Sequence, residues 1–164
     1  MRLVVMGVEA SGKSTVGREV AARAGWPFLD GDDFHTPEAR RKMAGGQALT
    51  DADRAPWLAR LRSELGARPD VVLACSALKR SYRDALRWPG VRFLFLNVPE
   101  PLLRERVAAR TGHYAGAALL PSQLATLEAP GPDEADVLTL DVGAADLPTD
   151  LARRALDALG AAHA

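Results

Sequence analysis

Apolar residues form five short, nearly continuous runs along the chain, and segments with helical periodicity separate them. The first run, RLVVM at 2–6, is typical of a strand that is buried on both faces of a sheet. In the next segment Val16, Val20 and Ala24 recur at helical spacing, and Gly25 ends the pattern. This alternation predicts an α/β fold with a parallel sheet and helices on both faces. The strands are expected at 2–6, 27–30, 70–77, 91–98 and 136–142, and the helices at 14–25, 37–45, 51–67, 78–87, 99–111 and 147–160.

The least regular part of the chain is 112–136, which holds Gly, Pro and one short helical candidate. A lid over a binding site is drawn from such a stretch, although a plain surface connection has the same composition. By contrast, the helix at 51–67 has a clear start, because Thr50 and Asp53 form a pair like a capping box. We therefore expect a single domain over 1–164, with a lid segment at about 111–130.

The amino-acid composition and the charge distribution limit the kinds of ligand and partner that the protein can be expected to bind. The 164 residues are 48% hydrophobic and 26% charged, with a formal net charge of zero, which is ordinary for a soluble domain. Residues 1–110 carry 19 Lys and Arg against 13 Asp and Glu, which suits an anionic small ligand, although surface composition alone produces the same bias. No basic stripe or aromatic platform indicates nucleic acid, and no apolar run is long enough to span a membrane. With Cys75 alone and a strand starting almost at Met1, we expect a cytoplasmic protein without a signal peptide.

The segment GVEASGKS at 7–14 matches G-x-x-x-x-G-K-[ST], the phosphate-binding P-loop, between a buried strand and an amphipathic helix. Its glycines allow consecutive N–H groups to face a phosphate, and the helix N-terminus adds positive potential. Lys13 is expected to reach the β- and γ-phosphates of ATP, and the Ser14 hydroxyl to bind Mg²⁺. Glu9 places a carboxylate beside the phosphate path, and Ala10 stands where a glycine is often found. The residues expected to bind ATP here are Gly7, Val8, Glu9, Ala10, Ser11, Gly12, Lys13, Ser14 and Thr15.

The acidic segment FLDGDDFH at 28–35 follows the second expected strand. P-loop proteins usually hold the metal's water shell with an acid after a buried strand, but the third strand here ends LACSALK without one. Asp30 and Asp32 lie at the carboxyl end of strand two, where open α/β sheets place their chemistry. We expect Asp32 to accept a proton from an attacking hydroxyl and Asp30 to orient Mg²⁺ through water, with Asp33 facing solvent. A tight turn with a helix cap is the alternative interpretation.

Taken together, several segments resemble the small P-loop gluconokinases over nearly the whole chain. They are GVEASGKST, FLDGDDFH, KMAGGQALTDADRAPWL, CSALKRSYRDALR, RTGHY and LEAP with EADVLTLDV. The resemblance implies a P-loop NTPase of the nucleoside-monophosphate-kinase-like fold, with a five-stranded parallel sheet in the order 2-3-1-4-5 and a small lid. It also implies phosphorylation of D-gluconate by ATP, giving 6-phospho-D-gluconate, and a homodimer. Shikimate kinases are similar relatives.

This resemblance assigns further residues. Lys79 and Arg83 lie four apart on one helix face, where they are expected to clamp the carboxylate of gluconate, although a solvated helix face is the alternative. Ser76 and His35 are expected to bind substrate hydroxyls, Asp53 and Arg54 to shape the pocket, and Trp57 to pack rather than contact substrate. Arg106 and Arg110 are expected at ATP, with Arg110 as a catalytic residue that stacks on adenine or covers the phosphates. His113 is expected in the lid, where it would bind substrate. Capping of a helix C-terminus is the alternative for the two arginines.

Two departures qualify these implications. No Lys or Arg occurs at 111–152, whereas a lid over a transferring phosphoryl group often supplies one, and Ala125 stands where the family commonly has an acid. A kinase for shikimate or another small hydroxy acid is the close alternative, but CSALK with YRD does not match the Gly-rich segment of shikimate kinases. A nucleotide-binding regulator with weak catalysis is the alternative from another class, because of Glu9 and the uncharged lid.

Overall fold

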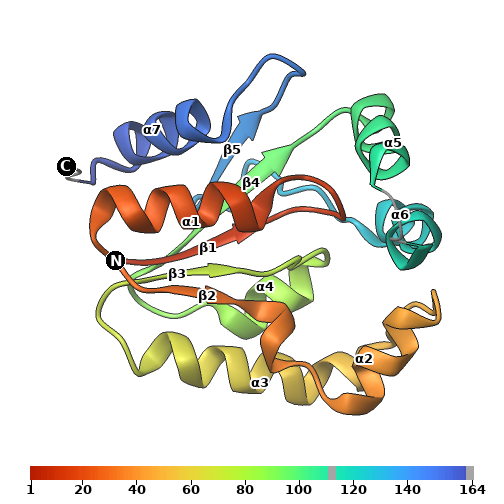
Figure 1. Ribbon diagram of the computed structural model, residues 1–164. Helices are drawn as coiled ribbons and strands as arrows, with labels where there is room; N and C mark the ends of the chain where they lie inside the picture. Colours follow the sequence, from red (N-terminus) through yellow and green to blue (C-terminus); the bar gives the residue numbers. More distant parts are fainter. Residues whose placement is uncertain (111–113, 162–164) are drawn as a thin grey trace.

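The central strand of the sheet is β1 (Arg2–Met6), and its residues 3–6 are completely buried. In the computed structural model, which describes residues 1–110 and 114–161, β1 pairs in parallel with β3 (Val71–Ala74) and β4 (Val91–Asn97). The outer strands are β2 (Phe28–Asp30) and β5 (Val137–Asp141), and the order is β2-β3-β1-β4-β5 (Figure 1). The predicted parallel sheet and its strand order are confirmed.

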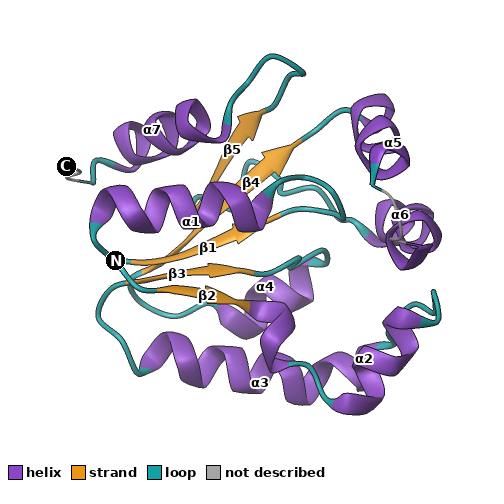
Figure 2. Ribbon diagram, viewed as in Figure 1, coloured by secondary structure: helices purple, strands orange, loops and turns teal. Residues whose placement is uncertain are grey.

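Helices cover both faces of this sheet. They are α1 (Lys13–Ala24), α2 (Pro37–Ala44), α3 (Asp51–Gly66), α4 (Arg80–Leu86), α5 (Glu100–Ala109), α6 (Tyr114–Thr126) and α7 (Pro148–Leu159), with a 3₁₀ helix η1 (Gly31–Phe34). Helices α1 and α7 pack together over one face, α3 packs against α4, and α5 packs against α6 (Figure 2). None of the helices in the described ranges combines the length and apolar composition needed to cross a lipid bilayer.

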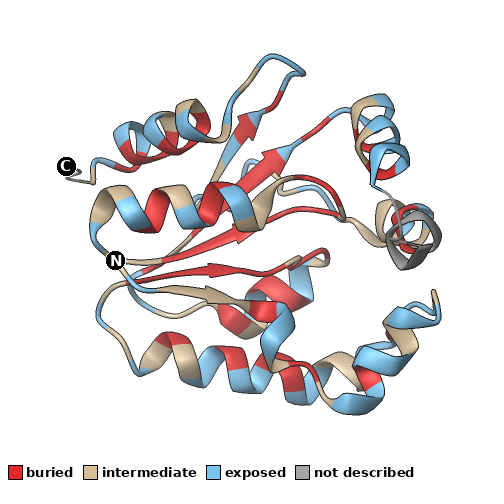
Figure 3. Cartoon of the chain, viewed as in Figure 1, coloured by how far each residue is buried: buried red, intermediate tan, exposed pale blue. Residues whose placement is uncertain are grey.

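The core lies between the inner strands and the helix faces turned toward them (Figure 3). Phe93 and Leu94 of β4 are completely buried, as are Leu61 of α3 and Leu156 of α7. The α3 helix begins as predicted, because the Thr50 side chain accepts the Asp53 N–H while the Asp53 side chain accepts the Thr50 N–H. This capping box fixes the start of α3 at Asp51.

One expectation for the chain after α5 differs from the structure. The interval 112–136 has only one short helical candidate by sequence, yet α6 extends over Tyr114–Thr126 with Pro121 in its interior. Leu119 and Leu120 of this helix are buried, and α6 contacts both α5 and α2. Burial against two other helices therefore stabilises a segment whose own helical signal is weak.

All five strands are parallel, so their carboxyl ends meet at one edge of the sheet. The P-loop follows β1 there, η1 follows β2, and the segment at 75–79 follows β3. Helices α2 and α6 contact each other beyond this edge. The fold thus brings the P-loop, η1 and the segment at 75–79 together at the edge of the sheet that faces α2 and α6.

Arg83 on α4 is completely buried, with 0% of its surface exposed. Its Nε and Nη2 donate to the two carboxylate oxygens of Glu134, each at 2.8 Å. Its remaining N–H groups donate to the carbonyls of Ala77, Leu78 and Glu128 at 3.0, 3.2 and 3.0 Å. All the donors of the guanidinium therefore have partners within the protein. The prediction that Arg83 clamps a substrate carboxylate is wrong, because its side chain points into the interior.

This buried ion pair makes stability depend on pH. The hydrogen bond from Arg83, reinforced by Arg87, lowers the pKa of Glu134 from 4.5 to about 2, against the opposing effect of burial. A lowered carboxylate pKa stabilises the folded state fully above the unfolded value, and this contribution is lost as the pH falls through the folded value. Stability from Glu134 is thus present above about pH 4.5 and disappears toward about pH 2.

Replacing Glu134 with Gln is expected to lower the free energy of unfolding by about 3–5 kcal/mol near neutral pH, because the buried Arg83 charge loses its partner. Urea titrations at about pH 7 and about pH 3 should show the difference from wild type shrinking in acid. Asp133→Asn is the control, since Asp133 pairs with Arg80 at the surface and its loss is expected to change stability little. Equal effects of the two substitutions would contradict this role of Glu134.

Candidate active site

The P-loop joins the end of β1 to the start of α1. Gly12 has a φ of 88° at the N-cap of α1, a left-handed conformation that glycine adopts without steric strain. Ala10 has a φ of 66°, so an alanine occupies a left-handed position that disfavours a Cβ by roughly 1–2 kcal/mol. The loop nevertheless closes, with the Ser11 N–H donating to the Val8 carbonyl at 3.2 Å. This conformation curls the backbone around a space that a phosphate can fill.

A cavity opens inside the curl of the loop, and we call it the P-loop cavity. It is lined by Glu9, Ala10, Gly12, Lys13, Ser14, Thr15, Asp32 and Arg110. Most of these belong to the predicted ATP-binding segment, so the structure brings them together around one space. Among the residues that the structure describes, Lys13 has no ion-pair partner. Its charge is therefore available to an anion.

Asp30 ends β2 directly beside the P-loop. The Ser14 hydroxyl donates to Asp30 Oδ2 at 3.4 Å, and Asp30 Oδ1 accepts the Asp32 N–H at 3.0 Å. Asp30 is therefore both the cap of η1, as the alternative interpretation of the sequence proposed, and a neighbour of Ser14. A hydroxyl and a carboxylate oxygen at the foot of a phosphate site suit Mg²⁺, which takes few protein ligands besides phosphate oxygens and water. Asp33 is exposed, as predicted.

The turn between the two aspartates is tightly packed. A Cβ on Gly31 would lie 2.6 Å from the Ala74 carbonyl oxygen at the end of β3, so only glycine fits. The Gly31 carbonyl accepts a buried hydrogen bond from Trp57 Nε1 at 2.7 Å. Strand β3 and helix α3 thus hold Asp30 and Asp32 in place from two sides.

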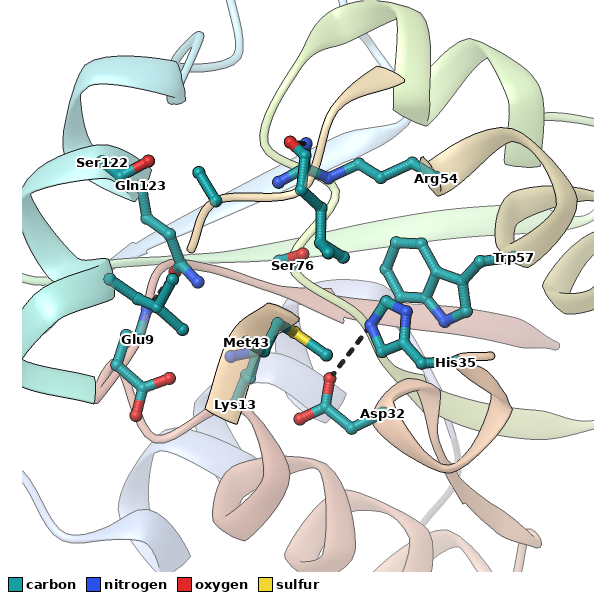
Figure 4. Close-up of a pocket in the computed structure, with 13 residues that line it drawn as sticks. Glu9, Lys13, Asp32, His35, Met43, Arg54, Trp57, Ser76, Ser122 and Gln123 are labelled. Atoms are coloured by element: carbon teal, nitrogen blue, oxygen red, sulfur yellow. Dashed lines mark hydrogen bonds and ion pairs between the residues drawn. The ribbon is translucent and has the colours of Figure 1, made fainter. Parts of the chain in front are cut away.

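Figure 4 shows a second cavity, which we call the Trp57 pocket. It is lined by Glu9, Lys13, Asp32, His35, Met43, Ala48, Leu49, Arg54, Trp57, Ser76, Leu119, Ser122 and Gln123. Glu9, Lys13 and Asp32 line both cavities. An acceptor in the Trp57 pocket therefore reaches the same lysine and aspartate as a phosphate in the P-loop cavity.

His35 and Asp32 are coupled at this junction. His35 is buried and stacks on the Trp57 ring with centroids 4.1 Å apart, and its Nε2 lies 3.7 Å from Asp32 Oδ1. The hydrogen bond with His35 is the largest influence lowering the pKa of Asp32, and Lys13 adds to it against partial desolvation of the carboxylate by the surrounding residues. Since 74% of the Asp32 side chain is exposed, this carboxylate is both ionised near neutral pH and open to a ligand.

Two arginines from the end of α5 reach back to the P-loop. Arg106 Nη1 donates to the Ala10 carbonyl at 3.1 Å, and Arg110 Nη1 donates to Glu9 Oε1 at 2.8 Å. Both line a third cavity, the Arg106 cavity, together with Ala10, Ser11, Gly12, Val16, Ala109 and Leu151. Arg106 and Arg110 therefore lie against the P-loop and do more than cap a helix, while their expected role at ATP stays a prediction. His113 lies outside the described residues.

Comparison with known proteins agrees with this geometry. A family profile described as an AAA domain matches residues 3–130. A gluconokinase from Gluconobacter oxydans is 51% identical over 138 residues, which cover 80% of this chain and 78% of the relative. The thermoresistant gluconokinase of Escherichia coli is 42% identical over 145 residues, covering 85% and 83%. The chain belongs to the gluconokinase family.

Solved structures place this gluconokinase family member among P-loop kinases. A gluconokinase from Sinorhizobium meliloti superposes with a TM-score of 0.87 at 48% identity, covering 97% of this chain and 91% of that one. A shikimate kinase from Aquifex aeolicus superposes with a TM-score of 0.62 at 18% identity, which shows a shared fold alone.

Only some of the residues predicted to bind substrate line the Trp57 pocket. Ser76, His35 and Asp32 line the Trp57 pocket together, and Arg54 lines it as well. Lys79 does not line this pocket. Its Nζ lies 3.3 Å from Asp51 Oδ1, and Asp51 does not line the pocket either. The residues that sequence reasoning missed are Met43, Ala48, Leu49, Leu119, Ser122 and Gln123.

Gln123 of α6 shows why such residues escape prediction. Its Oε1 accepts the Glu9 N–H at 2.7 Å, which ties α6 to the P-loop across 114 positions of sequence. No motif or spacing relates the two segments. Trp57, expected to pack only, both packs and lines the pocket. Asp53 bonds Lys42 and Thr50 and is absent from the lining residues.

Replacing Trp57 with Phe is expected to lower the free energy of unfolding by about 1–3 kcal/mol, because the buried Gly31 carbonyl loses its donor. Turnover should also fall, since Gly31 joins Asp30 to Asp32. Trp88→Phe is the matched control, because Trp88 Nε1 has no hydrogen-bond partner within the described part of the chain. Urea unfolding and ADP release measure the two effects, and equal losses in both variants would argue against this hydrogen bond.

Proposed function

We propose that this protein transfers the γ-phosphate of ATP to the 6-hydroxyl of D-gluconate, giving 6-phospho-D-gluconate and ADP. The observation that supports this most directly is the junction of the P-loop cavity with the Trp57 pocket at Lys13 and Asp32. A phosphoryl donor in the first and a hydroxyl acceptor in the second would meet at these two side chains. The family membership supports gluconate as the acceptor.

In this mechanism the P-loop backbone binds the phosphates, and Lys13 neutralises charge on the transferring group. Ser14 and Asp30 would hold Mg²⁺, directly and through water respectively. When bound, the ion neutralises negative charge on the phosphates. The protein's contribution is mainly positioning and fixed electrostatics, because phosphoryl transfer needs little covalent chemistry from the enzyme.

Asp32 acts on the acceptor. It accepts the proton of the 6-hydroxyl as the hydroxyl oxygen bonds to the γ-phosphorus, and the bond between that phosphorus and the bridging oxygen breaks to release ADP. Its lowered pKa keeps the carboxylate ionised near neutral pH, and the His35 contact orients it toward the pocket. Ser76 and His35 would bind other hydroxyls of the substrate.

Arg106 and Arg110 supply the positive charge at the nucleotide side. Residues 111–152 contain no Lys or Arg, so the segment after α5 has no cation of its own for the phosphates. Arg110 pairs with Glu9 in the structure, so an incoming phosphate would compete with Glu9 for this arginine. We assign Arg110 to the phosphates and Arg106 to the nucleotide and the loop backbone.

A cytoplasmic homodimer with a lid at about 111–130 stays a prediction that rests on the sequence and the family resemblance. Light scattering on the purified protein would measure the mass of the particle, and twice the chain mass is the expected result.

The first test of the function is a panel of acceptors with ATP. ADP release is expected with D-gluconate and not with shikimate, which lacks the open chain that the family acts on. Asp32→Asn is expected to reduce turnover by about a thousandfold or more while ATP binding is retained, because the proton acceptor is lost. Near-normal turnover of this variant would remove Asp32 from the role of base, and ATP binding without gluconate-dependent ADP release would favour a regulator.

The second test concerns the metal. Ser14→Ala and Asp30→Asn are each expected to raise the Mg²⁺ concentration needed for half-maximal ADP release by about tenfold, since each removes one oxygen contact or its water. Thr36→Ala is a control, because Thr36 caps α2 and does not line the P-loop cavity. An unchanged Mg²⁺ requirement in both site variants would contradict the assignment.

A further inference from the structure

The Trp57 pocket has two basic residues in its lining, Lys13 and Arg54. Among the described residues that line it, only Lys13 and Arg54 carry a permanent positive charge. Lys13 also lines the P-loop cavity, where its charge is needed by phosphate. Arg54 lies across the pocket from Lys13 and Asp32 (Figure 4). One cation is therefore left for an anionic group on the acceptor.

Arg54 is held in place by one of its nitrogens. Its Nη1 donates to the Leu49 carbonyl and, at 3.3 Å, to the Tyr82 hydroxyl. The guanidinium also lies over the Tyr82 ring, 5.1 Å from the centroid. These contacts leave Nε and Nη2 without a hydrogen-bond partner in the described ranges. Two donors on one edge of a guanidinium match the two oxygens of a carboxylate.

The neighbouring acid, Asp51, makes no direct hydrogen bond or ion pair with Arg54 in the described ranges, although after Tyr82 and Lys79 the charge of Arg54 also helps to lower the Asp51 pKa. Asp51 accepts hydrogen bonds from the Tyr82 hydroxyl and from Lys79 Nζ, at 3.3 Å for the latter, and it is not among the residues that line the pocket. No ion pair joins Arg54 to a carboxylate in residues 1–110 and 114–161. Arg54 is half-buried, and a partly buried charge without an ionic partner is unfavourable. An anionic ligand in the pocket would therefore stabilise this arginine.

We infer that Arg54 binds the carboxylate of an open-chain sugar acid and thereby selects the hydroxyl that is phosphorylated. The inference rests on the proposed function and deepens it. With the carboxylate at Arg54, a linear acceptor extends along the pocket, and its far terminal hydroxyl comes to Asp32 and Lys13. The regiochemistry then follows from the distance between the two charged ends of the pocket.

The walls between these ends suit a polyol chain. His35 Nδ1 is buried and has no hydrogen-bond partner among the described residues, and Ser76 and Ser122 line the same space. A buried polar atom without a partner is unfavourable until a ligand satisfies it. Met43 and Trp57 provide apolar surface for the C–H faces of the chain. This role of Arg54 replaces the one that the sequence suggested for Arg83.

The test compares Arg54→Gln with Arg60→Gln, an exposed cation on the same helix that does not line the pocket. For Arg54→Gln we expect kcat/KM for D-gluconate to fall about 100-fold, mainly through KM, because ground-state binding of the carboxylate is lost. The kcat/KM for D-glucitol, which has a CH₂OH group in place of the carboxylate, should stay within about twofold. The Kd for ATP should not change in either variant.

Arg54→Lys provides a second variant if the glutamine variant does not fold. It keeps the charge but not the paired donors, so we expect an intermediate fall of about tenfold for gluconate and none for glucitol. Retention of the wild-type KM for gluconate, or an equal loss with gluconate and glucitol, would overturn the inference. Calorimetric binding of gluconate separates it from the proposed function: binding that needs Arg54 but leads to no ADP release would overturn the function alone, and absence of binding to wild type would overturn both.

Discussion

The site depends on the parallel pairing of β1 with β3 and β4. Because all five strands run the same way, the P-loop, the Asp30–Asp32 turn and the segment after β3 end at one edge of the sheet. The packing there is close enough that Gly31 meets the Ala74 carbonyl and leaves no room for a side chain. The position of the Asp30 and Asp32 carboxylates is thus a consequence of the register between β2 and β3.

Around this edge most of the charged groups already have a partner. Arg83 is neutralised by Glu134 in the interior, Arg110 by Glu9 at the loop, and Lys79 by Asp51 at the surface. Asp32 is held by His35. The cations left without an ion pair among the described residues that line the cavities include Lys13 and Arg54, at opposite ends of one pocket. Such a distribution suits an acceptor with an anionic group at the end remote from the transferred phosphate.

Helix α6 connects the nucleotide side to the acceptor side. Gln123 accepts a hydrogen bond from the Glu9 N–H of the P-loop, while Leu119 and Ser122 line the Trp57 pocket. Ala10 keeps a left-handed conformation next to Glu9. The Gln123 amide bonds the P-loop and also lines the Trp57 pocket. A movement of the loop on phosphate binding would therefore shift residues that line the pocket.

The sequence alone determined the features that are local: the buried strands, the capping box of Thr50 and Asp53, the P-loop, and the position of Asp30 and Asp32 after a strand. Short-range patterns specify these, because hydrogen bonds and periodicity act over a few residues. The tertiary structure separated Arg83 from Arg54, because it buried the first and placed the second in the lining of the Trp57 pocket. Spacing of four residues put Lys79 and Arg83 on one helix face, but it could not tell whether that face meets solvent, substrate or the interior. Only the packing of α4 against the segment at 128–134 buried Arg83, and only the packing of α3 against α4 and η1 placed Arg54 at the pocket.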